Sequence, residues 1–176
     1  MTKTLVLLTL NEIEGLKALY NQIPFEGIDE VVAVDGGSTD GTREFLKEKG
    51  IRILDQEIKG RGEAFRVALR NTTGDILLYF SPDGNETPSD IPKLFAAIEN
   101  GSDVAIASRF MKESRNEEDD HFFRPRAWVN RTFTWIANTI WNKKNYVTDT
   151  INGYRALRRD IFNKLNTDER RFPIEY

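Results

Sequence analysis

Five short apolar runs, separated by polar loops and helix-like segments, constrain the fold of this chain most strongly. The runs span residues 4–9, 30–34, 51–54, 76–80 and 104–107. Nearly unbroken apolar runs of this length are typical of parallel strands whose two faces are both covered. The segments with helical spacing span residues 12–22, 42–49, 62–71 and 89–100. The alternation therefore predicts an α/β/α sandwich with a mainly parallel central sheet.

Length and composition predict one globular domain over residues 1–176, because a chain of this length can bury its own core. Its 25 basic and 28 acidic residues leave a net charge of -3, which gives no support to a broad nucleic-acid-binding surface. The absence of cysteine excludes disulfides and thiolate metal sites. The single histidine, His121, excludes histidine-rich metal centres.

The last third of the sequence is less regular. Residues 111–121 are charged and turn-rich, and two helices are predicted after them, one over residues 125–142 with all three tryptophans and a basic one near residues 158–165. The final letters FPIEY resemble the start of a strand, so we expect the chain to be cut short there. No stretch approaches the roughly 20 apolar residues that span a bilayer, and the N-terminus lacks a signal-peptide cleavage site. We therefore expect a cytoplasmic protein, either free or peripheral to the inner face of a membrane.

The second apolar run ends in a glycine-rich acidic loop, VVAVDGGSTDGT at residues 31–42. Ligands of parallel sheets bind outside the carboxyl ends of the strands, which is where Asp35 is expected. Its carboxylate could accept a hydrogen bond from a ribose hydroxyl or from a base N–H. A capped turn is an equally good interpretation of this loop alone, because Ser38, Thr39 and Asp40 are common capping residues.

A second loop, KGRGEAF at residues 59–65, brings Lys59 and Arg61 to the predicted start of a helix. Cations and free N–H groups at a helix N-terminus suit a phosphate. The loop is neither a Walker A motif nor a Gly-x-Gly-x-x-Gly fingerprint, which argues against an NTPase or a dehydrogenase.

The fourth apolar run ends in SPDGN at residues 81–85, where Asp83 and Asn85 flank Gly84. Both side chains can offer oxygen to one hard cation, and Mg²⁺ or Mn²⁺ bound with a diphosphate takes only one or two protein carboxylates. Pro-Asp-Gly-Asn is also a typical β-turn sequence. From this loop alone, the turn is the better interpretation and the metal site the alternative.

In their order along the chain, the loops resemble those of the family 2 glycosyltransferases with the GT-A fold, in particular the dolichyl-phosphate mannose synthase-like branch. The motifs that carry the resemblance are LTLNE at 8–12, VVAVDGGSTDGT at 31–42, KGRGEAFRVAL at 59–69, GDILLYFSPDGNETPSDIPKL at 74–94, DVAIASRF at 103–110 and DTINGYRALRRDIF at 149–162. The resemblance implies a single Rossmann-like GT-A domain, with a nucleotide-binding part at residues 1–110 and an acceptor-side part at residues 111–176.

For the donor, the resemblance implies that four loops bind the nucleotide sugar, through Leu10, Asn11, Glu12, Asp35, Gly60, Arg61, Gly62, Ser81 and Asp83. It assigns the metal, Mg²⁺ or Mn²⁺, to Asp83 and Asn85. Gly36 and Ser81 each stand where the family usually has an acid. The resemblance therefore implies a metal site with fewer carboxylates than usual.

For the acceptor, the resemblance points to Arg109, and on the long helix to Arg126 and Asn130, with Arg131 as an alternative. If the acceptor is a polyprenyl phosphate, no general base is required and arginines need only hold it, because a phosphate with a second pKa of about 6 is already largely anionic. A sugar hydroxyl would need a carboxylate base, for which Asp149 is the candidate. The aromatic residues of the helix equally fit core packing or a homodimer seam, and tryptophans beside arginines also suit a lipid headgroup interface.

The activity implied by the resemblance is inverting transfer of a sugar from a GDP- or UDP-linked donor to an acceptor such as polyprenyl phosphate. Its catalytic residues would be Asp83, Asp149 and Arg109. A different class, favoured by the missing acids, is a GT-A scaffold that binds a nucleotide sugar or a protein partner without turnover. A nucleotidyltransferase would want a basic, glycine-rich loop after the first strand, and TLNEIEG at residues 9–15 lacks it.

Overall fold

The computed structural model describes residues 1–109, 125–140, 146–150 and 152–164, and only the backbone of residues 125–128. Within this part of the chain, six strands form one sheet in the order β3-β2-β1-β4-β6-β5. Four strands run parallel: β1 (Lys3–Thr9), β2 (Glu30–Asp35), β3 (Arg52–Asp55) and β4 (Ile76–Phe80). β6 (Arg155–Arg158) is antiparallel to both of its neighbours, β4 and β5 (Val104–Ile106). The predicted mainly parallel sheet is confirmed.

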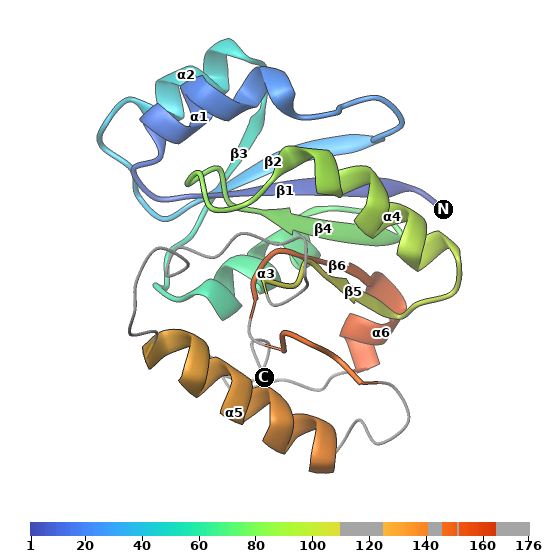
Figure 1. Cartoon of the computed structure of the whole chain (residues 1–176). Helices are drawn as coiled ribbons and strands as arrows, with labels where there is room; N and C mark the ends of the chain where they lie inside the picture. Colours follow the sequence, from blue (N-terminus) through green and yellow to red (C-terminus); the bar gives the residue numbers. More distant parts are fainter. Residues whose placement is uncertain (110–124, 141–145, 151, 165–176) are drawn as a thin grey trace.

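Helices cover both faces of the sheet (Figure 1). One face carries α1 (Ile13–Leu19), α2 (Thr42–Glu48) and α4 (Ile91–Glu99), and the other carries α3 (Arg61–Asn71) and α6 (Arg159–Lys164). The short helices η1 (Tyr20–Gln22) and η2 (Pro88–Asp90) follow α1 and precede α4. The long helix α5 (Pro125–Ile140) lies at the bottom of Figure 1. No helix in the described residues is both long enough and apolar enough to cross a bilayer.

The unbroken apolar runs exist because both faces of the central strands are buried. In β1, Leu5 and Leu7 belong to the core under α1, α2 and α4, whereas Val6 between them belongs to the core under α3. β4 follows the same alternation, with Leu78 in the first core and Leu77 and Tyr79 in the second. Each such side chain contributes about 1.5–3 kcal/mol when it is fully buried. The two central strands therefore anchor the sheet.

The strand β6 corrects the sequence prediction, which had a loop through residue 155 and a basic helix from about residue 158. Arg155–Arg158 instead pairs with two strands, so that Ala156 lies opposite both Leu78 and Ala105, and α6 begins at Arg159. A four-residue strand with arginine at both ends has little local strand signal, and its pairing partners decide its conformation.

Arg159 fixes the end of β6 to the end of α3. Its guanidinium donates to the carbonyls of Leu69 and Gly74, at 2.7 and 2.6 Å, and to Thr72 Oγ1 at 2.8 Å. A cation is favourable at a helix C-terminus, where backbone carbonyls lack partners within the helix. Arg159, the first basic residue after β6, therefore has a structural role.

The strand register brings five loops to one edge of the sheet. Thr9 lies opposite Asp35, and Asp35 lies opposite Asp55, so β1, β2 and β3 end side by side. β4 and β5 run in the same direction, and β6 begins at this edge because Tyr79 pairs with Arg155. This is the edge at which α/β sheets bind their ligands.

Candidate active site

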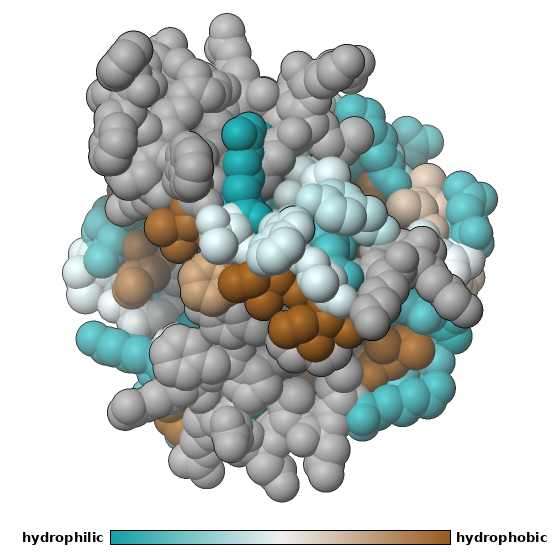
Figure 2. Space-filling view, turned by 60° about the horizontal axis from the view of Figure 1, so that its bottom comes forward, coloured by the Kyte–Doolittle hydropathy of each residue, from teal (hydrophilic) through white to brown (hydrophobic). Residues whose placement is uncertain are grey.

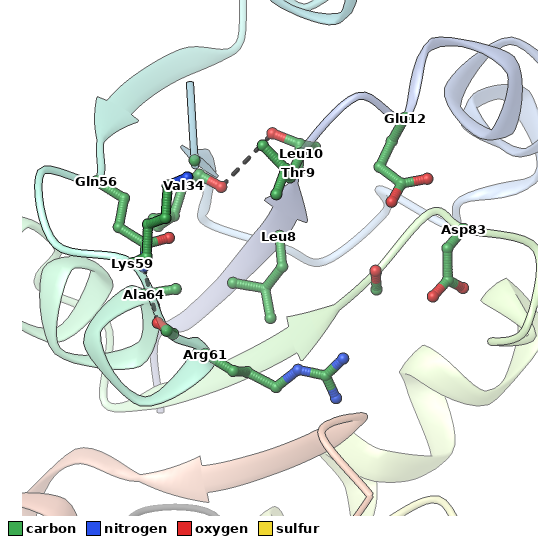
Figure 3. A pocket seen from close by; sticks show the side chains of 13 residues that line it. Leu8, Thr9, Leu10, Glu12, Val34, Gln56, Lys59, Arg61, Ala64 and Asp83 are labelled. Carbon is green, nitrogen blue, oxygen red and sulfur yellow. Dashed lines mark hydrogen bonds between the residues drawn. The ribbon is translucent and has the colours of Figure 1, made fainter. Parts of the chain in front are cut away.

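A pocket of about 360 Å³ opens at this edge, a volume typical of small-molecule sites. It is lined by Leu8, Thr9, Leu10, Glu12, Val34, Gly36, Gln56, Lys59, Gly60, Arg61, Ala64, Ser81 and Asp83 (Figure 3). Six of the predicted donor residues are among them: Leu10, Glu12, Gly60, Arg61, Ser81 and Asp83. Four separate strand ends therefore contribute to one concave site.

Asp35 lies in the chain between two residues that line the pocket, Val34 and Gly36, and its carboxylate holds the adjoining loop together. Its Oδ1 accepts hydrogen bonds from the Ser38 N–H at 2.9 Å and Arg43 at 2.9 Å, and its Oδ2 accepts from the hydroxyls of Ser38 at 2.6 Å and Thr9 at 2.9 Å. Burial alone would raise the pKa of Asp35, but these hydrogen bonds outweigh it and lower the pKa below its ordinary value. The side chain is fully buried. In this structure Asp35 organises the loop that follows it, whereas the sequence predicted a contact with the nucleotide.

Asn11 has a similar organising position. It is the one residue other than glycine with a positive φ in the described chain, at 58°. Its side-chain oxygen accepts from the Thr39 N–H at 2.9 Å, and its own N–H donates to the Ser38 hydroxyl at 2.8 Å. These bonds join the loop after β1 to the loop after β2.

Glu12 and Asp83 lie at the same end of the pocket (Figure 3). Burial raises the pKa of Glu12. Repulsion from the negative charges of Asp83 and Asp40 raises this pKa further. Asp83 is exposed, and its Oδ1 accepts the Asn85 N–H at 2.9 Å. The surplus of negative charge favours a bound cation.

The donor set fits a hard divalent cation that shares its shell with a ligand. Within the described ranges, no three acidic or histidine side chains converge so as to hold a metal on their own. Mg²⁺ and Mn²⁺ prefer carboxylate, carbonyl and water oxygens, and they are often completed by phosphate. Asp83 with the exposed side chain of Asn85 fits that pattern. Diphosphate oxygens and waters would supply the remaining ligands.

The opposite side of the pocket is cationic and is held by Gln56, which sequence reasoning missed. Its side-chain amide donates to the carbonyls of Ile58 and Gly60, both at 2.7 Å, and so fixes the loop before α3. Gly60 adopts a φ of +129°, which side chains rarely allow. The only available signal was the place of Gln56 directly after a strand end.

Arg61 extends along the pocket toward β6 (Figure 3). A Cβ added to Gly153 would lie 2.6 Å from a guanidinium nitrogen of Arg61. The glycine of the NGYRALRR segment therefore makes room for this arginine. Gly62, also predicted at the donor site, is buried in the first turn of α3 and does not line the pocket.

Arg109 and Asp149 form a bidentate ion pair. Arg109 Nε donates to Asp149 Oδ2 at 2.8 Å, and one terminal nitrogen donates to Oδ1 at 3.2 Å. The Asp149 side chain is fully buried, whereas that of Arg109 is 36% exposed. A general base needs an accessible oxygen. The arrangement therefore favours Asp149 as the residue that orients Arg109 over Asp149 as a free base.

Helix α5 buries two polar side chains, Thr134 and Asn138, and exposes several apolar ones. Buried Asn138 bonds the backbone of Val147 in both directions, at 2.7 and 2.9 Å, and buried Thr134 contacts the Thr150 hydroxyl at 3.4 Å. The exposed apolar residues are Val129, Phe133, Trp135, Ile136 and Ile140. Figure 2 shows hydrophobic side chains gathered on the face turned toward the viewer.

Among the predicted acceptor residues of α5, Asn130 is half-buried and Arg131 is exposed. The Arg126 side chain lies outside the described residues, as do those of Trp128 and Trp141. Trp135 is 62% exposed, so the predicted alternative of core packing is wrong for the one tryptophan whose side chain is described.

Glu86 is a second acid that sequence reasoning missed. It is partly buried, and its Oε2 accepts the backbone N–H of Ser81 at 2.6 Å. Burial raises the pKa of Glu86 to about 8; Asp83 also raises this pKa, whereas Arg61 and Arg109 lower it. The pKa of the Glu86 carboxyl therefore depends on charges of both signs.

The chain belongs to Glycosyl transferase family 2, whose profile matches residues 5–165. It is 29% identical to the "Dolichol-phosphate mannosyltransferase" of Pyrococcus furiosus, over 92% of this chain and 47% of that protein. It is 28% identical to the "Dolichyl-phosphate hexose transferase" of Haloferax volcanii, over 92% of this chain and 68% of that protein. The chain thus spans about half the length of some curated relatives it matches.

The fold is that of a GT-A glycosyltransferase. A crystal structure of glucosyl-3-phosphoglycerate synthase from Mycobacterium tuberculosis, in complex with Mn²⁺, UDP and glucosyl-3-phosphoglycerate, superposes with a TM-score of 0.72 at 24% identity. The match covers 93% of this chain and 59% of that one. The predicted GT-A architecture is confirmed.

A tight contact between α1 and the loop after β4 gives a first prediction. A Cβ added to Gly15 would lie 1.7 Å from the carbonyl oxygen of Pro82, a backbone atom that cannot move without shifting the loop that carries Asp83. Alanine normally stabilises a helix over glycine by about 1 kcal/mol. We expect Gly15→Ala instead to destabilise the protein by about 1–3 kcal/mol, as overpacking does. Urea unfolding measures the change.

The neighbouring substitution Glu14→Ala is the matched control, because the Glu14 side chain is 85% exposed. It should change the free energy of unfolding by less than about 0.5 kcal/mol. A Gly15→Ala variant that is as stable as wild type would show that the loop after β4 does not pack on α1 in this way.

Proposed function

We propose that the protein transfers a sugar, with inversion at the anomeric carbon, from a nucleotide diphosphate sugar to a polyprenyl phosphate. The observation that carries the proposal is the charge of the pocket lining, which combines two cations, Lys59 and Arg61, with two carboxylates, Glu12 and Asp83. Cations suit the oxygens of a diphosphate, and carboxylates suit a divalent cation that bridges them. The relatives named for dolichol phosphate support the acceptor class.

In the proposed reaction, Asp83 with Asn85 would hold Mn²⁺ or Mg²⁺, which acts as a Lewis acid toward the leaving diphosphate. Lys59 and Arg61 bind the diphosphate from the other side. Leu10 offers exposed apolar surface to the nucleoside. GDP- and UDP-linked donors both fit these contacts, because none of them reads a base edge.

On the acceptor side, an anionic phosphate needs positioning and no general base, since it is already largely ionised at neutral pH. Arg109 would bind it while Asp149 fixes the guanidinium in place. The exposed apolar residues of α5 would face the lipid chain, which makes the protein peripheral to a membrane. A homodimer through the same face is the alternative use of these residues.

The ion pair gives a second prediction. Asp149→Asn keeps the volume of the side chain but removes the charge that orients Arg109, and a hydrogen bond to a charged group contributes about 1.5–3 kcal/mol. We expect the KM for a polyprenyl phosphate to rise by roughly 10–100-fold, with donor binding within about twofold of wild type. Steady-state kinetics with varied acceptor, alongside calorimetry with UDP or GDP, measures both. An equal loss of donor and acceptor binding would contradict the assignment to the acceptor side.

The direct test is incubation with labelled UDP- and GDP-sugars, Mn²⁺ and a polyprenyl phosphate in detergent, followed by extraction of a lipid-linked sugar. The proposal expects labelled lipid that depends on both metal and acceptor. Metal-dependent donor binding without product or release of nucleotide would instead support the non-catalytic scaffold, which the replacement of acids by Gly36 and Ser81 favours.

A further inference from the structure

One glycine of the chain lies against the side chain of a pocket arginine. A Cβ added to Gly153 would lie 2.6 Å from Arg61 Nη1, 3.1 Å from its Cδ and 3.3 Å from its Cζ. All three atoms belong to one side chain, so Gly153 packs along the outer half of Arg61. Arg61 lines the pocket and extends toward β6 (Figure 3). A glycine that does not itself line the pocket therefore limits where a pocket cation can lie.

The backbone around Gly153 is held in place on both sides. The Asn152 side-chain amide donates to the carbonyl of Ala107 at 2.6 Å, and its oxygen accepts the Tyr154 N–H at 3.3 Å. The Ala107 N–H donates in turn to the Tyr154 carbonyl at 3.0 Å, and the Tyr154 side chain is buried. A side chain added at position 153 would therefore displace the arginine more easily than it would displace this turn.

The Arg61 side chain is the part of this contact that can move. It is exposed, and within the described ranges its guanidinium donates to no protein acceptor, so packing sets its position. A guanidinium binds phosphate oxygens through a planar fork of N–H donors, which makes the interaction sensitive to its orientation. Gly153 does not have a positive φ, so its backbone conformation also suits alanine. Alanine at this position would therefore act mainly on the position of Arg61.

We propose that Gly153 is a positioning residue for the donor diphosphate, because its lack of a side chain leaves the space in which Arg61 lies and so sets how the guanidinium meets the phosphates. This inference rests on the proposed function and concerns the same pocket. Gly153 follows closely in the chain after Asp149, which pairs with Arg109 at 2.8 Å. The same stretch of chain thus orients one arginine for the donor and one for the proposed acceptor.

The test is a double-mutant cycle, measured by calorimetric titration of UDP, and separately of GDP, into the protein with Mn²⁺ present. Arg61→Ala should lower nucleotide affinity by roughly 10–100-fold, as loss of a hydrogen bond to a charged group does. Gly153→Ala should lower it by roughly 5–50-fold, because the arginine is displaced but still present. In the Arg61→Ala background, Gly153→Ala should change the affinity by less than about twofold, since no arginine remains to be displaced.

The cycle separates positioning from a general loss of structure, because a structural role would lower the affinity equally with and without Arg61. The urea midpoint of Gly153→Ala should also stay close to that of wild type, since only an exposed side chain has to give way. Wild-type nucleotide affinity in Gly153→Ala, or equal losses in both backgrounds, would overturn the inference while leaving the proposed function intact. Absence of UDP and GDP binding by the folded wild-type protein would overturn both.

Discussion

Replacing Asp83 by alanine is expected to abolish the Mn²⁺-dependent part of UDP or GDP binding, with a loss of at least about 100-fold. Asp83 is an exposed carboxylate that lines the pocket, as Glu12 does, and it lies in the loop after the buried strand β4. Without its charge, a divalent cation would lose its strongest protein ligand. Metal-free nucleotide binding should be unchanged, because Lys59 and Arg61 stay in place. Calorimetry with and without Mn²⁺ measures both quantities.

Two further variants control for the shape of this loop. Asp83→Asn keeps the oxygen that accepts the Asn85 N–H, so it preserves the turn while it removes the charge. It should lose metal-dependent binding nearly as fully as the alanine variant. Ser81→Ala should do little, because the Ser81 group used in the structure is its backbone N–H. Unchanged Mn²⁺-dependent binding by Asp83→Ala would show that the metal assignment is wrong.

Asp35→Ala is expected to lower the free energy of unfolding by about 3–5 kcal/mol, as does removal of one partner from a buried charged network. The substitution removes the carboxylate that accepts from Thr9 and Ser38 and one of the two carboxylates that pair with Arg43. Because Thr9 and both chain neighbours of Asp35, Val34 and Gly36, line the pocket, nucleotide affinity should fall as well. Urea unfolding and calorimetry measure the two effects.

The matched control is Asp55→Ala. Arg43 also pairs with Asp55 at 2.7 Å, but the Asp55 side chain is 71% exposed, and exposed pairs contribute less than about 1 kcal/mol. If Asp35→Ala is no more destabilising than Asp55→Ala, Asp35 does not hold this loop.

The Asp35 carboxyl also predicts that the stability of the protein depends on pH. Its pKa is lowered in the folded protein below the ordinary value of 3.8, so the folded state binds this proton less tightly than the unfolded state. Its contribution is fully present above pH 3.8 and is lost as the pH falls through the folded pKa. Asp35→Ala should therefore lose stability less steeply than wild type on acidification.

Much of the fold followed from local patterns. Unbroken apolar runs predicted all four parallel strands and β5, because burial of both strand faces leaves a clear signal. β6 was missed, since the strands with which it pairs, β4 and β5, are far from it in the sequence. The sequence likewise did not predict whether the apolar face of α5 is exposed, because periodicity shows that an apolar face exists but not whether it packs on the core.

The site was predicted in part for the same reason. Asp83, in the loop after β4, was expected at this edge because parallel strands end there, and it does line the pocket. Glu86 and Gln56 were missed, since their importance depends on contacts with the backbone of other loop residues. For Asp35, the motif placed the residue at the end of a strand, where it lies, but could not show that its oxygens would accept hydrogen bonds from Thr9, Ser38 and Arg43.

The central claim is that this pocket binds a nucleotide diphosphate sugar together with a divalent cation. Calorimetric titration of UDP- and GDP-sugars into the wild-type protein, with and without Mn²⁺, tests it most directly. The account predicts that at least one nucleotide sugar binds, and that Mn²⁺ raises its affinity by about tenfold or more. Absence of binding by every UDP- and GDP-sugar, in the presence of Mn²⁺ and with the protein shown to be folded, would contradict it.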